Sequence, residues 1–270
     1  MAELPRETHV LDAVVSLVDT LLDDFDVVDL LIQLTEQCAA LLDIASAGLL
    51  LADPRSRLHL MAATTRKTRD LELFQLQSHE GPCLDSYASG QPISVVDLQS
   101  EHQRWPRFAA AATEAGFASI HAVPIRAAST VLGALGLFGT NVGKLNSADL
   151  LVGRTLAHVA CVAILQERAP TAQTVLSPLR NALVSRIVVD QATGFLHEHF
   201  DLPLDEAFTL LRRYARDHNK HLTDVSRQLV TEPDARRLLL PEIARVASDP
   251  SLTDSPTASA SNRKDTAEGL

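Results

Sequence analysis

The order of predicted secondary-structure elements constrains the fold of this chain more than any other feature. Apolar residues at helical spacing predict helices over residues 9–22 and 26–42. Two short apolar runs then follow, at 47–52 and 58–63, with Asp53-Pro54 at the turn between them. Two such runs around a turn predict an antiparallel hairpin.

The elements after this hairpin do not alternate regularly between strand and helix. They are predicted as a helix at 69–77, a strand at 93–96, an Ala-rich helix at 105–115, strands at 119–126 and 131–138, and a long helix at 147–168. A parallel nucleotide-binding sheet would require βαβα alternation. The sequence therefore predicts an antiparallel sheet flanked by helices.

Beyond residue 170 the pattern becomes purely helical. Helices are predicted over 175–200, from Pro203, and from Leu222 with Thr223 as cap, and residues 233–247 suggest a further short one. Pro170 and Pro178 interrupt helical periodicity, which favours a domain boundary near residue 170. We therefore expect an α+β domain over 1–170 and an all-α three-helix domain over 175–232. Residues 248–270 are rich in Ser, Thr, Asp and Pro and are predicted to be disordered.

Composition excludes several classes of protein. A formal net charge of −10 argues against a protein that wraps duplex DNA through a broad basic face. The three cysteines include no CxxC pair, which excludes a disulfide scaffold and a cysteine-rich zinc site. We see no signal peptide and no apolar run of about 20 residues, the length that a membrane helix needs. The expectation is a soluble cytoplasmic protein with no membrane association.

Charge is distributed unevenly along the chain. Residues 1–60 contain eleven Asp and Glu against three arginines, whereas between Glu206 and Arg227 basic residues outnumber acidic ones. This asymmetry suggests two modules with different partners, and two ordinary solvated surfaces are the alternative explanation.

Two stretches of the helical region resemble a known family. They read ALVSRIVVDQATGFL (182–196) and LDEAFTLLRRYARDHNKHLTDVSRQLV (204–230), and together they resemble an ANTAR domain. The preceding module resembles a GAF domain, through EGPCLDSYASGQPISVVDL, RWPRFAAAATEAGFASIHAVPIR and VLGALGLF. The resemblance implies a regulator of transcription antitermination, with a sensory domain that binds an unknown small molecule. Its partner would be RNA carrying paired small-loop hairpins, bound by a homodimer.

The resemblance also implies an RNA-binding surface. Its residues match or adjoin the ANTAR pattern: Arg186, Gln191, Arg212, Arg213, Tyr214, Arg216 and Asn219. Arginines would bind phosphates, Gln191 would read a base, and Tyr214 would stack on a base or else belong to the core. The chain departs from the family at Thr193, where the family has lysine, and this loss is expected to weaken RNA binding if that lysine contacts phosphate. Two smaller departures are Asp190 in place of glutamate and Pro203 where a polar helix cap is common.

A ligand pocket is expected in the GAF-like module. Its candidate lining residues are Leu50, Cys83, His121 and Leu135, with residues 80–85 as a loop beside it. A filled core without a ligand is the alternative. Cys83 is a candidate thiol sensor or a ligand contact, although no basic neighbour is visible in the sequence.

The remaining motifs do not predict catalysis. Four histidines have metal-like spacing but form no closed ligand set: His197, His199, His218 and His221. No nucleotide-binding or hydrolase motif is present, so we expect a protein that is not an enzyme. The alternative function is a nucleotide or redox sensor whose C-terminal helices serve only dimerisation or bind DNA. Helix 147–168 carries more apolar residues than packing on one sheet face requires, which favours a homodimer. These residues are Leu151, Leu156, Val159, Val162, Ile164 and Leu165.

Overall fold

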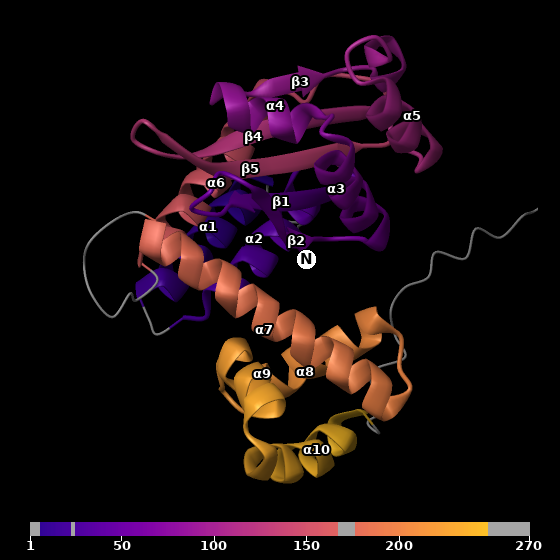
Figure 1. Cartoon of the computed structure of the whole chain (residues 1–270). Helices are drawn as coiled ribbons and strands as arrows, with labels where there is room; N and C mark the ends of the chain where they lie inside the picture. Colours follow the sequence, from indigo (N-terminus) through magenta and orange to yellow (C-terminus); the bar gives the residue numbers. More distant parts are fainter. Residues whose placement is uncertain (1–5, 23–24, 167–175, 248–270) are drawn as a thin grey trace, which may run out of the picture.

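The part of the chain that the structure describes folds into an α+β unit followed by four helices (Figure 1). A computed structural model describes residues 6–22, 25–166 and 176–247. The expected domain boundary near residue 170 and the tail 248–270, which we predict to be disordered, lie outside the described residues.

Among the described residues, the sheet has five strands, all antiparallel, in the order β2-β1-β5-β4-β3. Their bounds are β1 Ser46–Ala52, β2 Leu58–Ala63, β3 Ile93–Val95, β4 Ser119–Ala127 and β5 Thr130–Gly139. These strands confirm the predicted antiparallel sheet and the hairpin predicted over residues 47–63. In the register of β1 and β5, Leu49 lies opposite Leu135 and Leu50 lies opposite Ala134. Because neighbouring residues of a strand face opposite sides, this register divides the core into two layers.

Helices cover both faces of the sheet (Figure 1). One face packs against α2 Val27–Leu41 and α6 Ser147–Gln166, and α1 Arg6–Leu22 packs on those two helices. The other face packs against α3 Arg66–Ser78, α4 Pro82–Ser89 and α5 Pro106–Glu114. A short 3₁₀ helix, η1 Leu98–Glu101, follows β3.

Helix α4 was missed by the sequence prediction, which treated residues 80–85 as a loop. Pro82 begins this helix in the first turn, where its missing N–H costs nothing. Gly90 ends it at φ 63°, in the left-handed region that favours glycine. The segment is only eight residues long, so periodicity carried little information about it.

Although we expected no apolar run of membrane-spanning length, helix α6 is long and apolar enough to cross a membrane, judged by length and composition alone. Half of that apolar stretch is buried inside the protein, where it covers the sheet. The core helix of a soluble protein has the same properties.

The C-terminal helices pack on one another as predicted. They are α7 Leu176–Phe200, α8 Leu204–Asp217, α9 Leu222–Thr231 and α10 Pro233–Ala247. Helix α7 contacts both α8 and α9, and α10 covers the same pair. Ala207 and Leu211 of α8, with Val225 and Leu229 of α9, are buried against α7 and α10. The α+β unit and the helical region thus confirm the predicted fold class.

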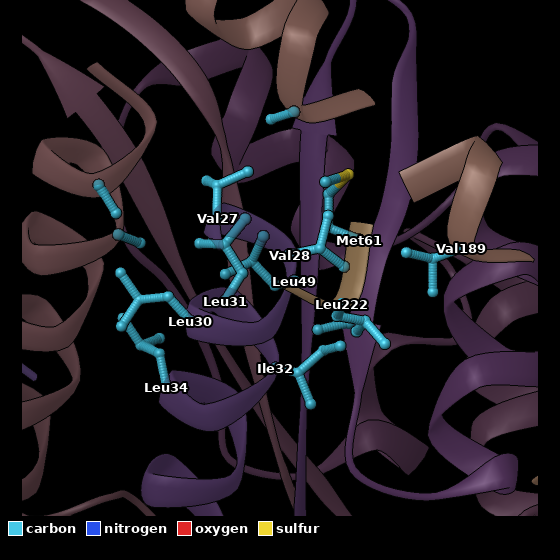
Figure 2. Close-up of a cluster of buried hydrophobic side chains, with 14 of the residues drawn as sticks. Val27, Val28, Leu30, Leu31, Ile32, Leu34, Leu49, Met61, Val189 and Leu222 are labelled. Carbon is cyan, nitrogen blue, oxygen red and sulfur yellow. The ribbon is translucent and has the colours of Figure 1, made fainter. Parts of the chain in front are cut away.

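The hydrophobic core runs without a break from the α+β unit into the helical region. Val28 and Ile32 of α2 belong to the same buried cluster as Met61 of β2, Val189 of α7 and Leu222 of α9. Figure 2 shows these side chains around α2. Because buried apolar area stabilises such contacts, α2 links the sheet and the C-terminal helices through one continuous core.

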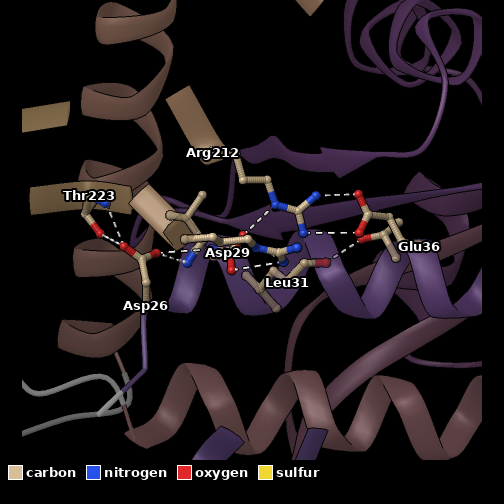
Figure 3. Close-up of polar contacts among 9 residues, drawn as sticks. Asp26, Asp29, Leu31, Glu36, Arg212 and Thr223 are labelled. Atoms are coloured by element: carbon tan, nitrogen blue, oxygen red, sulfur yellow. Dashed lines mark hydrogen bonds and ion pairs between the residues drawn. The ribbon is translucent and has the colours of Figure 1, made fainter. Parts of the chain in front are cut away.

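The carboxylate of Asp26 caps two helices. Its Oδ1 accepts hydrogen bonds from Val28 N at 2.9 Å and Asp29 N at 3.1 Å, which confirms the predicted cap of α2. Its Oδ2 accepts from Thr223 N at 2.7 Å and from the Thr223 hydroxyl (Figure 3). The prediction that Thr223 caps α9 was therefore wrong. The N-cap residue, His221, makes no side-chain cap bond, and the acceptor comes from a residue 197 positions earlier.

Replacing Asp26 by alanine tests this double cap. We expect Asp26→Ala to lower the free energy of unfolding by about 2 kcal/mol, because an N-cap side chain contributes about 1 kcal/mol and two helices lose theirs. Asp234→Ala, an exposed acid in the first turn of α10, is the matched control and should leave the unfolding midpoint nearly unchanged. Urea denaturation followed by circular dichroism measures both. Equal midpoints for the two variants would contradict the double cap.

Candidate nucleic-acid interface

Two arginines of the expected RNA surface lie on one side of α8 and point toward α2. Arg212 donates from Nε to Asp29 Oδ1 at 2.6 Å and from Nη1 to Glu36 Oε1 at 2.5 Å (Figure 3). A further bond joins Arg212 Nη2 to Glu36 Oε2 at 3.1 Å. Arg216, one turn later, donates from Nη2 to Asp29 Oδ2 at 3.2 Å. The structure thus pairs these two arginines with carboxylates of the α+β unit.

The Arg212 side chain is 12% exposed, whereas that of Arg216 is 51% exposed. Burial acts to lower the pKa of Arg212, but the hydrogen bond to Glu36 and the charges of Asp29 and Glu36 outweigh it and raise that pKa. Arg212 is therefore a charged, largely desolvated group that depends on its two carboxylate partners.

The other two arginines of the expected surface form ion pairs within their own helices. Arg213 pairs with Asp217 at 3.6 Å and is about a quarter exposed. Arg186 pairs with Asp190 at 2.9 Å, and its guanidinium lies 5.8 Å from the centre of the Phe208 ring. Arg186 is buried, and burial lowers its pKa despite the nearby charge of Asp190. Its Nε has no hydrogen-bond partner among the described residues.

Tyr214 is fully buried, so in this structure it offers no face for stacking on a base. Its hydroxyl donates to Glu242 Oε2 of α10 at 2.5 Å, and its ring stacks on His218 with 4.1 Å between the ring centres. Burial and Glu242 raise its pKa. Helix α10 follows the ANTAR-like stretch, so the motif alone did not reveal that it covers this ring.

The remaining residues of the expected surface have different environments. Gln191 is exposed on α7. Asn219 is exposed at φ 49°, a left-handed conformation that asparagine tolerates, in the turn that ends α8. Thr193 is buried and donates its hydroxyl to Val189 O at 2.9 Å. Its side chain therefore packs inside the helical domain, so the absent family lysine has no exposed counterpart here.

A polar cluster is buried on the opposite face of the sheet, between α3, α4 and the strands. Gln75 Nε2 donates to Glu72 Oε2 at 2.8 Å, and Gln75 Oε1 accepts from Cys83 N at 3.1 Å. The Cys83 thiol lies 3.6 Å from Glu72 Oε1. A Cβ atom on Gly48 or Gly136 would lie 2.6 or 2.7 Å from that oxygen, so the carboxyl needs glycine in both strands.

Comparisons with known proteins agree with the two sequence resemblances. The family model for the GAF domain matches residues 26–165, and the model for the ANTAR domain matches residues 178–230. The chain belongs to the GAF family and has the GAF–ANTAR architecture. A search of curated proteins gave no match.

Solved structures similar to the GAF–ANTAR chain include GAF domains of other proteins. The GAF domain of an Acinetobacter phosphoenolpyruvate-protein phosphotransferase is 16% identical, with a TM-score of 0.47, and the match covers 61% of this chain and 97% of that one. Free methionine-R-sulfoxide reductase from Neisseria meningitidis, solved with its substrate, is 15% identical with the same TM-score, over 67% and 96% of the two chains.

The GAF domain does not gather the four expected pocket residues at one place. Leu50 and Cys83 lie in a buried cluster on the α3–α4 face. Leu135 belongs to the core on the α2–α6 face. His121 borders an open groove of about 390 Å³ at one end of the sheet, lined also by Ser119 and residues 139–146. Its ring nitrogens contact Ser94 Oγ at 2.7 Å and Leu145 N at 3.2 Å.

The Cys83 thiol is poorly suited to redox sensing in the GAF domain. It is fully buried, and burial together with the negative charge of Glu72 raises its pKa well above the ordinary value. Reactive cysteines need an accessible thiolate. Within the described parts of the chain, no group of three or more His, Cys, Asp or Glu residues is arranged to bind a metal ion.

Sequence reasoning missed Glu72 and Gln75 in the GAF core, and it also missed Asp29 and Glu36 as partners of Arg212. Glu72 and Gln75 are three residues apart, which places them on one side of a helix, and this spacing was a usable signal. The acids of α2 had no comparable signal, because their partners are more than 170 residues away.

The stability of the GAF–ANTAR chain should depend on pH through Glu72. Burial raises the pKa of this carboxyl from 4.5 to about 8, so the folded state favours its protonated form. The contribution of the protonated Glu72 carboxyl to the free energy of unfolding is complete below pH 4.5 and is lost as the pH rises toward 8. One pKa unit corresponds to about 1.4 kcal/mol, so between pH 5 and 8 the free energy of unfolding should fall by about 3 kcal/mol more than in Glu72→Gln.

Urea titrations at several pH values measure this difference, with Glu114→Gln, an exposed acid on α5, as the control. Parallel pH profiles for wild type and Glu72→Gln would contradict a protonated Glu72.

Proposed function

We propose that this GAF–ANTAR chain is a non-enzymatic, cytoplasmic regulator of transcription antitermination that binds RNA. Its ANTAR domain binds paired small-loop hairpins in leader transcripts, and its GAF domain senses a small molecule or another signal. We assign residues 1–170 to the sensor and 175–232 to the RNA-binding domain. The observation that carries the proposal is the ANTAR match over 178–230, which contains the arginines of α8.

The chemistry of α8 supports RNA as the ligand. Arginine has a planar fork of donors that binds a phosphate through two hydrogen bonds. Arg212 and Arg216 are four residues apart and share one side of the helix, a spacing that suits neighbouring phosphates. Arg213, Arg186, Gln191 and Asn219 complete the proposed contact set. Tyr214 is left to the core in this proposal, because its ring is buried.

A homodimer would supply two RNA-binding surfaces for two hairpins. Support comes from apolar side chains that are exposed on two adjacent helices. They are Leu11, Val15, Val18 and Leu22 on α1, and Leu151, Val162 and Leu165 on α6. By contrast, the neighbouring Leu156, Val159 and Ile164 of α6 are buried within the chain. Exposed apolar stripes of this kind mark protein–protein contact surfaces, and we propose that α1 and α6 pair with a second copy.

Removing both α8 arginines tests RNA binding. In a gel-shift titration with a leader RNA that carries two small-loop hairpins, Arg212→Ala/Arg216→Ala should weaken binding by at least about 10-fold. Two phosphate contacts are lost, so the negative slope of log K against log salt should become less steep by about 2. Arg237→Ala, on the exposed side of α10, is the control. Equal affinities for wild type and the double variant would contradict the proposal, as would duplex DNA that competes as well as RNA does.

The dimer is tested by charging the apolar stripes. Val15→Glu and Val162→Glu should each convert a dimer into a monomer of 29.2 kDa at tens of micromolar protein, measured by light scattering after gel filtration. A glutamate placed in an apolar contact loses its hydration without gaining a partner. Val142→Glu changes a valine between β5 and α6 that is more exposed than either test residue, and this variant should remain dimeric. A wild type of monomer mass would rule out the dimer.

A further inference from the structure

Two arginines of the proposed RNA surface, Arg212 and Arg216, are already paired with carboxylates of the GAF domain. Arg212 makes three hydrogen bonds to Asp29 and Glu36, two of them as a parallel pair to the two oxygens of Glu36. Arg216 donates to both oxygens of Asp29, at 3.4 and 3.2 Å. Asp29 therefore lies between the two arginines and accepts from both.

Carboxylate and phosphate groups bind a guanidinium group in the same way. Both accept paired, charge-assisted hydrogen bonds from its planar fork. A phosphate that approached Arg212 would have to displace Glu36, because the Arg212 side chain is only 12% exposed. RNA and the acidic side of α2 therefore compete for the same donors.

We propose that α2 is an internal inhibitor of RNA binding, in which Asp29 and Glu36 occupy the arginine positions that RNA phosphates take in the open protein. This inference rests on the proposed function and specifies how the same site is regulated. Helix α8 must leave α2 before both arginines can contact RNA.

Two further contacts hold the inhibited arrangement in place. The Asp26 carboxylate accepts a hydrogen bond from Thr223 N at the N-terminus of α9, and α9 is the helix that follows α8. Val28 and Ile32 of α2 share a buried cluster with Val189 and Leu222 of the ANTAR domain. The carboxylates therefore face the arginines in a fixed register, and their alignment does not depend on flexible surface side chains.

Helix α2 also connects the inhibitory contact to the sensor. Its other sides pack on the sheet and on α1 and α6 through Val27, Leu30, Leu31 and Leu34. A change in the packing of the sheet or of a dimer contact at α1 and α6 is thereby transmitted to Asp29 and Glu36. The signal would release the arginines by moving one helix.

Neutralising the two carboxylates tests the inference in the full-length chain. Asp29→Asn/Glu36→Gln should bind the two-hairpin RNA at least 10-fold more tightly than wild type in the same gel-shift titration. Asp70→Asn/Glu114→Gln makes the same change in net charge at exposed sites on α3 and α5, and its affinity should stay within 2-fold of wild type. Adding Arg212→Ala/Arg216→Ala to the first pair should abolish the gain.

The outcomes separate the two proposals. If wild type binds RNA through the arginines and Asp29→Asn/Glu36→Gln binds equally tightly, the inhibitory role of α2 is overturned and the proposed function stands. If the charge control gains as much affinity as Asp29→Asn/Glu36→Gln, the inhibitory role is also overturned. If no variant binds RNA, both proposals fail.

Glu36→Gln alone is a second test in case the double variant misfolds. This single change should leave the fold intact, because Glu36 is half exposed and lies outside the first turn of α2. It should give a smaller gain in affinity with an unchanged circular dichroism spectrum. No gain in this folded variant would overturn the inference.

Discussion

The Asp26 carboxylate joins the two domains at the start of two helices, and the contacts around it depend on that position. Asp26 accepts backbone hydrogen bonds at the start of α2 through one oxygen and at the start of α9 through the other. Helix N-termini carry unsatisfied N–H groups and a partial positive charge, so one anion between two of them stabilises both. Helix α9 has no side-chain cap from its own N-cap residue, His221. The ANTAR domain is therefore completed by a residue of the GAF domain.

Helix α2, which begins at this shared cap, has a different function on each of two sides. Toward the sheet it presents leucines and valines that hold the GAF domain together, and toward α8 it presents Asp29 and Glu36. Paired, partly buried charges contribute little net stability, but removing one partner leaves the other desolvated. Loss of its carboxylate partners would leave the charge of Arg212 desolvated and unpaired. An RNA phosphate can take their place, so Arg212 can exchange one anionic partner for another. The structure in this sense suits a regulated site better than a permanently open one.

The sequence allowed the fold to be predicted because its signals are local. Hairpins, helical periodicity and the ANTAR pattern each extend over a few to some tens of residues, and they placed the sheet and the α7–α9 helices correctly. The short helix α4 was missed because eight residues hold too little periodicity. The contact set of the site was harder to predict. The motif identified Arg212 and Arg216, but their carboxylate partners are set by tertiary packing across more than 170 residues. Burial of Tyr214 likewise depends on Glu242, outside the motif.

Hydrogen exchange measured with and without RNA tests the central claim most directly. The claim is that RNA and α2 cannot hold the α8 arginines at the same time. Mass spectrometry of the full-length chain with excess two-hairpin RNA should therefore show slower exchange in α8. Exchange should become faster in α2, which loses its cover, and at the N-terminal turn of α9, where the bond from Thr223 N to Asp26 is broken. Slower exchange in α8 with no change in α2 and α9 would contradict the account, because the arginines would then bind RNA without leaving the GAF domain.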